Sequence, residues 1–228
     1  MSQEILSQSE KEANRLQDAS ARRIIARLAD LGFTPEELNE AIAEHEGDFR
    51  DEHPQVYCGT YGKYAGGSIA GKWIDLTTFF GKPKRQAGHS DFDEFITFCK
   101  AIHADEEDPE LMFQDFECFP REWYSESCMD EDDFEHIQEY WKMVEEHGSE
   151  VIEAFLDCYD ADQLEHFDDM YLGQYDDEED YARQYVAECY DLDKMMGDLA
   201  NYFDYEALGR DLFSYDLQIS DGYVFRAY

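Results

Sequence analysis

The chain has 228 residues, of which 56 are acidic and 18 basic, for a formal net charge of −38. Such an excess of like charge favours solubility but opposes compaction through self-repulsion. Disorder is excluded, because 43% of the residues are hydrophobic and 15% are aromatic, enough to form packed cores.

The negative charge is concentrated in the second half of the chain. Residues 1–55 carry a net charge of −7, residues 56–103 carry +2 and residues 104–228 carry −33. A protein adapted to high salt should be acidic over every exposed face, so this local bias disfavours that interpretation. In the stretch FDDMYLGQYDDEEDYARQY (167–185), seven carboxylates are interleaved with aromatic residues and only Arg183 is basic.

Residues 1–55 predict a helical hairpin. Apolar residues recur at helical spacing at Leu16, Ile24, Ile25, Leu28 and Leu31, and Gly32 can end that helix. The run Thr34-Pro35-Glu36-Glu37 supplies the N-cap, first-turn proline and third-position glutamate of a second helix, which Leu38, Ile42 and Ala43 continue. The cluster Arg22, Arg23 and Arg27 is interpreted as a solvated face rather than a nucleic-acid site, because the segment is acidic overall.

From Val56 the sequence predicts a small α+β domain that ends near residue 120. The runs VYCGTYGKY and IAGKWIDL, on either side of a glycine-rich turn, have the texture of short strands. Ser90 is expected to cap a helix over DFDEFITFCKAIHA, with an apolar stripe of Phe92, Phe95, Ile96, Cys99 and Ile102. The stretch LMFQDFECF (111–119) is expected to return as a strand.

Two further domains are predicted, at 121–163 and 164–228. The first is helical, because Phe134, Ile137, Trp141 and Val144 repeat every three to four residues, as do Ile152, Phe155, Leu156 and Tyr159. The second begins with strand-like MYLGQY, continues with helices over DYARQYVAECY and DKMMGDLANYFDYEALGRDLF, and ends in a strand pair around Asp221-Gly222. The predicted fold class is therefore α+β.

No motif in the chain selects an enzyme. The stretch GGSIAGKW (66–73) has phosphate-loop spacing, but Trp73 replaces the magnesium-binding Ser or Thr and strand-like sequence follows. A glycine-rich turn between strands is the alternative. Asp176, Glu178 and Asp180 alternate as in a calcium loop, yet the required glycine and the loop-closing glutamate are missing.

Cys99 and His103 lie four residues apart on one predicted helix and could bind a metal. Because no second pair with ligand spacing accompanies them, we expect a half-buried thiol beside a surface imidazole. His136, His147 and His166 have no metalloprotease or triad-like setting, and among 56 carboxylates proximity does not identify an acid–base pair. We expect no cofactor and no metal.

Cysteine usage and the N-terminus indicate an intracellular protein. The cysteines at 58, 99, 118, 128, 158 and 189 form no CxxC motif, and the first residues contain no apolar signal segment. No apolar run approaches the length of a membrane span. We therefore expect a cytoplasmic protein with free thiols and no membrane partner.

Several uncommon strings occur in a distinctive order along the chain. They are YCGTYGKYAGGSIAGKWIDL (57–76), DEEDPELMFQDFECFP (105–120), FDDMYLGQYDDEEDYA (167–182), NYFDYEALGRDLF (201–213) and GYVF (222–225). On these strings, residues 56–228 resemble the ArdA family of antirestriction proteins, carried by conjugative elements and phages. Residues 1–55 lie outside the resemblance as a helical extension.

The resemblance implies an elongated, bent rod of three small domains that forms a homodimer. Its carboxylates would stand in for the phosphates of bent B-form DNA and occupy the DNA-binding site of type I restriction-modification enzymes. Such proteins are inhibitors rather than catalysts, and no direct nucleic-acid binding is expected. The phosphate surrogates expected here are Asp105, Glu106, Glu107, Asp108, Glu110, Asp115, Glu117, Asp130, Glu131, Asp132, Asp133, Asp168, Asp169, Asp176, Asp177, Glu178, Glu179 and Asp180.

The antirestriction motif region, LDKMMGDLANYFDYEALGRDL (192–212), is expected to hold the dimer contact near Leu199, Tyr202, Phe203 and Tyr205. Apolar side chains beside a strongly acidic surface are otherwise hard to keep exposed. The alternative is that these four side chains belong to the domain core.

The charge is sufficient for mimicry of a short duplex. Duplex DNA carries one charge per ~1.7 Å, so the net −31 of residues 56–228 corresponds to roughly 53 Å, or about 15 base pairs, and a dimer to about 31. The main rival is a general acidic binder or chaperone of basic DNA-binding proteins without DNA-like geometry. A third interpretation is an acidic enzyme with an unrecognised site.

Overall fold

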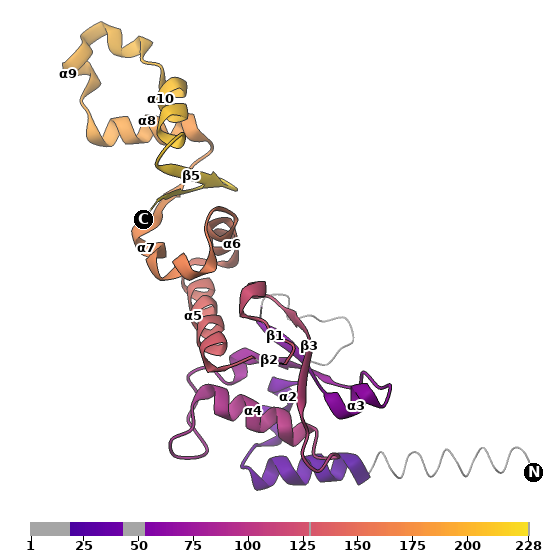
Figure 1. Ribbon diagram of the computed structural model, residues 1–228. Coiled ribbons are helices and arrows are strands. Elements are labelled where there is room, and N and C mark those ends of the chain that lie inside the picture. Colours follow the sequence, from indigo (N-terminus) through magenta and orange to yellow (C-terminus); the bar gives the residue numbers. More distant parts are fainter. Residues whose placement is uncertain (1–18, 43–52, 128, 228) are drawn as a thin grey trace, which may run out of the picture. The chain divides into compact units, whose positions relative to one another are not determined.

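The computed structural model describes residues 19–42, 53–127 and 129–227, and it is a mixed α+β structure with two three-stranded antiparallel sheets (Figure 1). The chain divides into two compact units, unit 1 (Met1–Lys142) and unit 2 (Met143–Tyr228), each with one sheet. The α+β prediction is confirmed. The finer division at residues 55, 120 and 163 stays a prediction. Leu16, Ala43 and Cys128 lie outside the described residues.

In the described part of the N-terminal segment, residues 19–30 are helical. The helix ends at Gly32, whose φ of 86° is available to glycine without steric cost. The Phe33 N–H donates to the Leu28 carbonyl at 2.9 Å and the Gly32 N–H to the Ala29 carbonyl at 3.0 Å, the two bonds of a Schellman motif. The predicted helix end is thus confirmed.

Helix α2 (Pro35–Ala41) follows after the predicted cap. The Thr34 hydroxyl accepts from the Glu37 N–H while the Glu37 carboxylate accepts from the Thr34 N–H, so both halves of a capping box are present. Ile42 then forms an isolated antiparallel bridge with Ile74. The described residues 19–42 confirm the helical hairpin and place its end against the sheet.

The sheet of unit 1 has the strand order β2-β1-β3, with β1 (Gln55–Thr60) at its centre. The other elements that the structure describes in this unit are α3 (Tyr61–Ala65), β2 (Lys72–Asp75), η1 (Leu76–Thr78), α4 (Asp91–Ile102), β3 (Leu111–Glu117), η2 (Arg121–Trp123) and the greater part of α5 (Glu131–His147). The boundary between the units falls within α5.

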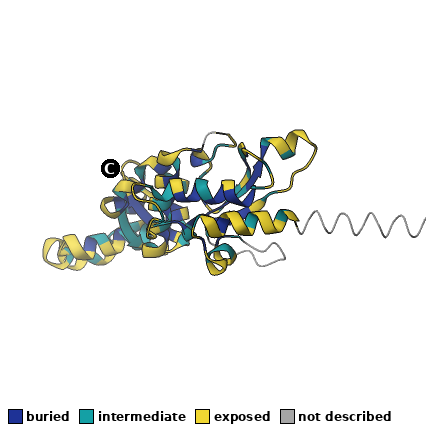
Figure 2. Cartoon of the chain, turned by 90° about the horizontal axis from the view of Figure 1, so that it is seen from below, coloured by how far each residue is buried: buried dark blue, intermediate teal, exposed yellow. Residues whose placement is uncertain are grey.

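Helix α4 supplies much of the core of unit 1. Ser90 caps it in a second capping box, as predicted. Phe95 and Cys99 from the predicted stripe are fully buried, and so is Phe98, which the stripe omitted. Phe95 stacks on Phe134 of α5 with 5.3 Å between ring centroids. Figure 2 shows that buried residues lie on the strands and inner helix faces.

Two strand predictions in unit 1 are wrong in part. The run VYCGTYGKY forms β1 only to Thr60, and residues Tyr61–Ala65 form helix α3 because the Thr60 hydroxyl accepts from the Lys63 N–H and caps it. The run IAGKWIDL forms β2 only over Lys72–Asp75, because the Asp75 carboxylate accepts from the Thr77 N–H and starts η1. In both places a side-chain cap ends the strand.

Unit 2 contains a sheet with the strand order β4-β6-β5. Its described elements are α6 (Ser149–Cys158), η3 (Ala161–His166), α7 (Phe167–Met170), β4 (Tyr171–Gln174), α8 (Glu178–Cys189), α9 (Leu192–Met196), η4 (Gly197–Tyr202), α10 (Tyr205–Phe213), β5 (Leu217–Ser220) and β6 (Tyr223–Arg226). The helices at 131–158, the strand in MYLGQY and the terminal strand pair are as predicted.

Three features fix the fold of unit 2. Asp221 and Gly222 join β5 to β6 with positive φ angles of 46° and 81°, as a two-residue hairpin turn requires. The ring of Phe155 meets those of Phe167 and Phe225 edge to face, each at 5.4 Å, and all three are fully buried. Gly209 lets α10 approach α8 closely, since an added Cβ would lie 2.5 Å from the Glu178 carbonyl oxygen.

Candidate interaction surface

None of the eighteen predicted phosphate surrogates is buried. Twelve are exposed, namely Asp105, Glu107, Asp108, Glu110, Asp115, Asp130, Glu131, Asp132, Asp168, Asp169, Asp176 and Asp177. The other six are half-buried, namely Glu106, Glu117, Asp133, Glu178, Glu179 and Asp180. The fully buried carboxylates Asp75 and Glu94 were not among those predicted. The structure therefore leaves the predicted set accessible to solvent, within each unit taken by itself.

Several of these solvent-accessible carboxylates also stabilise the start of a helix. At α8, the Asp177 carboxylate accepts from the Asp180 N–H at 2.9 Å, and that of Asp180 accepts from the Asp176 N–H at 3.3 Å. Negative charge is favourable at a helix N-terminus because the helix dipole is positive there. Glu179 forms an ion pair with Arg183 at 2.5 Å, one turn further along α8. Local folding thus accounts for part of the acidity.

The start of α5 repeats this arrangement. The carboxylate of Asp130 accepts from the Asp133 N–H at 3.0 Å, and the carboxylate of Asp133 accepts from the Asp130 N–H at 3.3 Å. Burial raises the pKa of Asp133, and this outweighs the lowering by its bond from the Asp130 N–H. Asp133 is half-buried and bonded to the helix start, so it is less accessible to a partner than the exposed Asp130.

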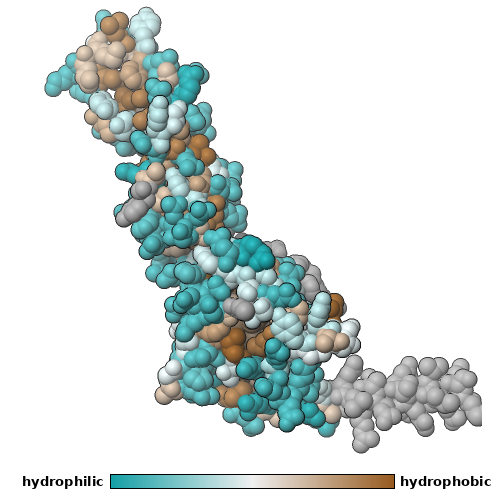
Figure 3. Space-filling model, in the orientation of Figure 1, coloured by the Kyte–Doolittle hydropathy of each residue, from teal (hydrophilic) through white to brown (hydrophobic). Residues whose placement is uncertain are grey.

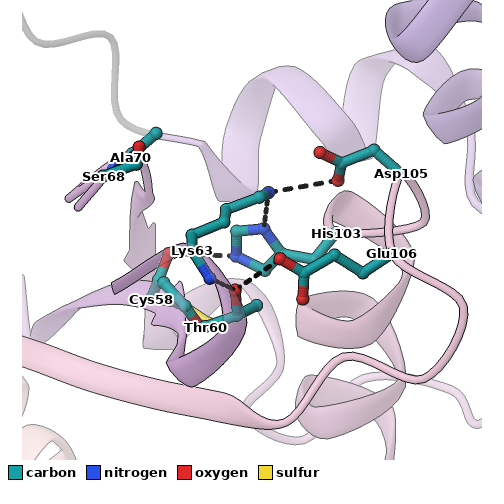
Figure 4. Close-up of polar contacts among 9 residues, drawn as sticks. Cys58, Thr60, Lys63, Ser68, Ala70, His103, Asp105 and Glu106 are labelled. Carbon is teal, nitrogen blue, oxygen red and sulfur yellow. Dashed lines mark hydrogen bonds and ion pairs between the residues drawn. The ribbon is translucent and has the colours of Figure 1, made fainter. Parts of the chain in front are cut away.

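A third group of carboxylates lies in the loop between α4 and β3, at residues 104–110. Here Asp105 pairs with Lys63 at 3.1 Å, and Glu106 accepts from the Thr60 hydroxyl at 2.9 Å (Figure 4). Glu107, Asp108 and Glu110 are exposed. Residues of β1 and α3 therefore contact only the first two acidic side chains of this loop.

The expectation for Cys99 and His103 is wrong. Both are buried, with 0% and 2% exposure, because Cys99 faces β1 and the polar atoms of His103 find partners inside the domain. A hydrogen bond from Cys99 lowers the pKa of Cys58 to about 6; burial opposes this shift, and His103 and Lys63 add to it. Among the residues that the structure describes, no three His, Cys, Asp or Glu side chains converge as a metal site.

The glycine-rich stretch 66–73 is a turn that leads into a strand. Residues 72–75 form β2, so no helix N-terminus follows the glycines to bind a phosphate. The Tyr57 hydroxyl donates to the Ile69 carbonyl and accepts from the Gly71 N–H, both at 3.0 Å, which holds the turn in place. The interpretation as a glycine-rich turn between strands is confirmed.

The antirestriction motif region presents apolar side chains to solvent. Leu199 is 63% exposed and Tyr202 is 85% exposed, so the alternative that they belong to the domain core is wrong. Phe203 and Tyr205 are half-buried and meet edge to face at 4.9 Å. The neighbouring Met195, 66% exposed, was not predicted, although its place in the motif could have suggested it.

We call the exposed side chains of Met195, Met196, Leu199 and Tyr202 the motif surface. It lies on α9 and η4, and Figure 3 shows hydrophobic residues at the top of the view, in the region where Figure 1 labels α9. Exposed apolar patches on soluble proteins commonly mark contacts with other chains. No described helix has the length and apolarity needed to cross a membrane.

The structure thus defines a mixed α+β protein with a strongly acidic, solvent-accessible surface. A family model for the antirestriction protein ArdA matches residues 56–225, most of the chain, and the protein therefore belongs to the ArdA family. The match confirms the family indicated by the sequence strings and leaves the N-terminal segment outside it. A comparison with curated proteins found no match. Membership implies that restriction enzymes are the targets.

Proposed function

We propose that this protein inhibits type I restriction-modification enzymes by occupying their DNA-binding site, with its carboxylates in place of the phosphates of bent B-form DNA. The observation that carries the proposal is the net charge of −33 over residues 104–228, combined with the solvent accessibility of all eighteen predicted surrogates. The Lys and Arg side chains of the enzyme, arranged for DNA, would meet these carboxylates and release counterions as they do on DNA.

Unit 2 alone has enough charge to replace a turn of duplex. It contains 24 acidic and 4 basic residues, for a net charge of −20 over 86 residues. At one charge per ~1.7 Å of duplex axis, this equals roughly 34 Å, or about 10 base pairs. In this role the protein would protect the DNA of a mobile element from host restriction in the cytoplasm without itself binding nucleic acid.

We further propose that the motif surface is the contact of a homodimer. Leu199→Asp combined with Tyr202→Asp should shift the protein to monomer, because two charges would be buried without partners in the interface. Light scattering over a range of protein concentrations measures this. Tyr215→Ser is the control, since Tyr215 is 86% exposed but lies outside the motif surface. A double variant with the mass of the wild type would place the dimer contact elsewhere.

Competition with DNA tests the inhibitory function. The protein is titrated against a labelled duplex of about 40 base pairs, longer than the equivalent of a dimer, bound to a type I methyltransferase core at fixed salt. An unrelated basic protein is titrated in parallel. Displacement of DNA near one dimer per enzyme, with no binding to the control, supports DNA mimicry. Equal binding to both proteins would instead favour the general acidic binder or chaperone, and binding to neither would reject both functions.

A further inference from the structure

The acidic loop, residues 104–110, is fastened to the sheet of unit 1 by a chain of polar contacts. The Lys63 ammonium donates to His103 Nδ1 at 2.8 Å and to the Asp105 carboxylate at 3.1 Å (Figure 4). Since an ammonium can only donate, Nδ1 accepts, and His103 Nε2 is the donor to the Cys58 carbonyl at 3.1 Å. The carbonyl belongs to β1 and His103 is 2% exposed, so this chain of contacts ends in the rigid core.

A second set of contacts runs parallel to the first. The Thr60 hydroxyl donates to Glu106 at 2.9 Å and accepts from the Lys63 N–H at 3.2 Å, so it joins the loop to the start of α3. Glu106 also lies close to Gly62, where an added Cβ would be 3.3 Å from its carboxylate oxygens. The backbone closes the loop, because the Tyr61 N–H donates to the Glu110 carbonyl at 3.0 Å.

These contacts divide the five acidic side chains of the loop into two groups. Asp105 and Glu106 turn toward β1 and α3, where Lys63 and Thr60 satisfy them. Glu107, Asp108 and Glu110 are exposed, and within the described chain no hydrogen bond or ion pair holds their carboxylates. The inner pair fixes the loop backbone, and the outer three extend from it.

We propose that Lys63 and Thr60 are positioning residues that hold the acidic loop in one conformation, so that Glu107, Asp108 and Glu110 present a fixed set of charges to the target's cationic DNA-binding surface. This inference rests on the proposed function. A fixed loop binds more tightly than a mobile one because it has less conformational freedom to give up on association. This role would also explain why a positively charged residue, Lys63, lies beside a loop whose carboxylates would bind the basic side chains of the target.

The variant Lys63→Met, made in the full-length protein, distinguishes the effect of loop positioning on target affinity from the effect of net charge. The variant has one positive charge fewer, so long-range electrostatics alone predicts equal or tighter binding to a basic target. Positioning predicts the opposite, a loss of affinity of about tenfold, because the loop must be ordered on binding. Lys72→Met is the matched control, since Lys72 is exposed on β2 and its replacement changes the net charge equally. Affinity is measured by displacement of duplex from the methyltransferase core.

A charge-neutral pair of variants repeats the test. Thr60→Val removes the hydroxyl that contacts Glu106 at a site that is 1% exposed, whereas Thr60→Ser keeps it. Weaker binding by Thr60→Val and wild-type binding by Thr60→Ser support the proposal. Hydrogen exchange of the amides at 104–110 reports on the loop directly, and it should accelerate in Lys63→Met and Thr60→Val but not in the Lys72→Met or Thr60→Ser controls.

The outcomes are separable. Binding by Lys63→Met as tight as that of Lys72→Met, with unchanged exchange in the loop, would overturn the positioning role. If Lys63→Met does not fold, the Thr60 pair decides in its place. If the wild type and Lys72→Met both fail to displace DNA, the proposed function is wrong, and hydrogen exchange alone then decides whether these residues order the loop.

Discussion

Arg85 contacts three side chains from distant parts of the sequence. Its guanidinium donates to Glu37 of α2 at 2.5 Å and to Glu94 of α4 at 2.8 Å, and it lies 3.7 Å above the ring of Phe33. Glu94 is 4% exposed, so Arg85 supplies the charge that makes its burial tolerable. This side chain fastens the N-terminal segment, outside the family match, to residues within it, and the segment is part of the fold of unit 1.

The contact with Glu37 should make the stability of unit 1 depend on pH. Burial raises the pKa of Glu37, but the Thr34 N–H and the Arg85 guanidinium outweigh it and hold the pKa below its ordinary value. A lowered pKa in the folded state contributes stability that is present above the unfolded pKa, about 4.3, and lost as the pH falls through the folded value. Glu37→Gln should therefore destabilise unit 1 near neutral pH, by under about 1 kcal/mol, and less in acid.

Urea unfolding at pH 7 and below pH ~4 measures this difference. The three tryptophans all lie in unit 1, so their fluorescence follows it selectively. Glu36→Gln is the control, because it removes the same charge from the exposed neighbouring position. Equal effects of the two substitutions at both pH values would mean that the ion pair with Arg85 contributes nothing to the docking of α2.

His103 shows the limit of reasoning from residues alone. Its spacing from Cys99 is visible in the sequence, but its burial depends on partners 40 and 45 positions away, Lys63 and the Cys58 carbonyl. The two ion pairs that Arg85 forms with Glu37 and Glu94 cannot be predicted from the sequence for the same reason. Sequence patterns report which residues are chemically suited to a contact, whereas the contact itself requires the tertiary fold.

At the scale of elements, helices α8 and α10 of unit 2 approach each other closely at Gly209. An added Cβ there would lie 2.5 Å from the Glu178 carbonyl oxygen and 2.8 Å from its carbon. Backbone atoms cannot rotate away as a flexible side chain can. The separation of these two helices is therefore set by the absence of a side chain at one position.

The substitution Gly209→Ala tests this packing, because helix propensity and the close contact with α8 predict opposite changes in the stability of unit 2. Helix propensity alone predicts that the substitution stabilises α10 by about 1 kcal/mol. The collision with α8 predicts a net destabilisation of unit 2 by about 2 kcal/mol. Hydrogen exchange of the α8 and α10 amides measures the change, with Ala187→Ser at an exposed position of α8 as control. Slower exchange in Gly209→Ala would show that the helices separate without strain.

The elements that sequence predicts well are those with their own local signals. Helix α4 has a capping box and an apolar stripe, and the hairpin at Asp221-Gly222 has the residues that positive φ angles favour. Helix α3 has neither length nor periodicity. Its five residues depend on the Thr60 cap and on contacts with the acidic loop, so local pattern alone indicated a strand. Short elements of this kind follow tertiary contacts.

At the scale of the whole molecule, many carboxylates would share the binding of the target. Single Asp→Asn changes should then be nearly silent, while clusters should weaken inhibition. Asp168, Asp169 and Asp176 are exposed and none is an N-cap residue, and the contact of Asp168 with His147 at 3.5 Å lies at the surface, so a triple Asn variant removes charge with a small effect on folding. The triple substitution should reduce the slope of log affinity against log salt by up to about 3, at roughly 0.9 for each phosphate-like charge removed from the interface.

The salt dependence of target binding measures this prediction. The control neutralises Asp30, Glu36 and Glu40, three exposed carboxylates of the N-terminal segment, and gives the same net charge. An equal change of slope in the two triple variants would show that binding responds only to total charge. Abolition of inhibition by any one substitution would contradict a shared surface altogether.

Composition and family strings suffice to place the acidic surface on the second half of the chain, and solvent exposure of the carboxylates agrees with it. They do not reveal which carboxylates also have local roles. Asp177 caps α8, Asp130 caps α5 and Asp105 pairs with Lys63, and each role depends on where a helix begins or how a loop folds back. The sequence therefore predicts how much negative charge the surface has, whereas the fold determines which carboxylates are held by local contacts.

Strand β3 lies at an edge of its sheet, and its Phe113 N–H already pairs with the Glu126 carbonyl. Beyond that point Asp115 and Glu117 follow on the same strand. An open strand edge invites a strand from another molecule, and charged side chains discourage this by repulsion. The same carboxylates would therefore protect the protein from aggregation while it accumulates in the cell. Variants in which they are neutralised should be checked for intermolecular β-sheet before any decrease in inhibition is ascribed to weaker target binding.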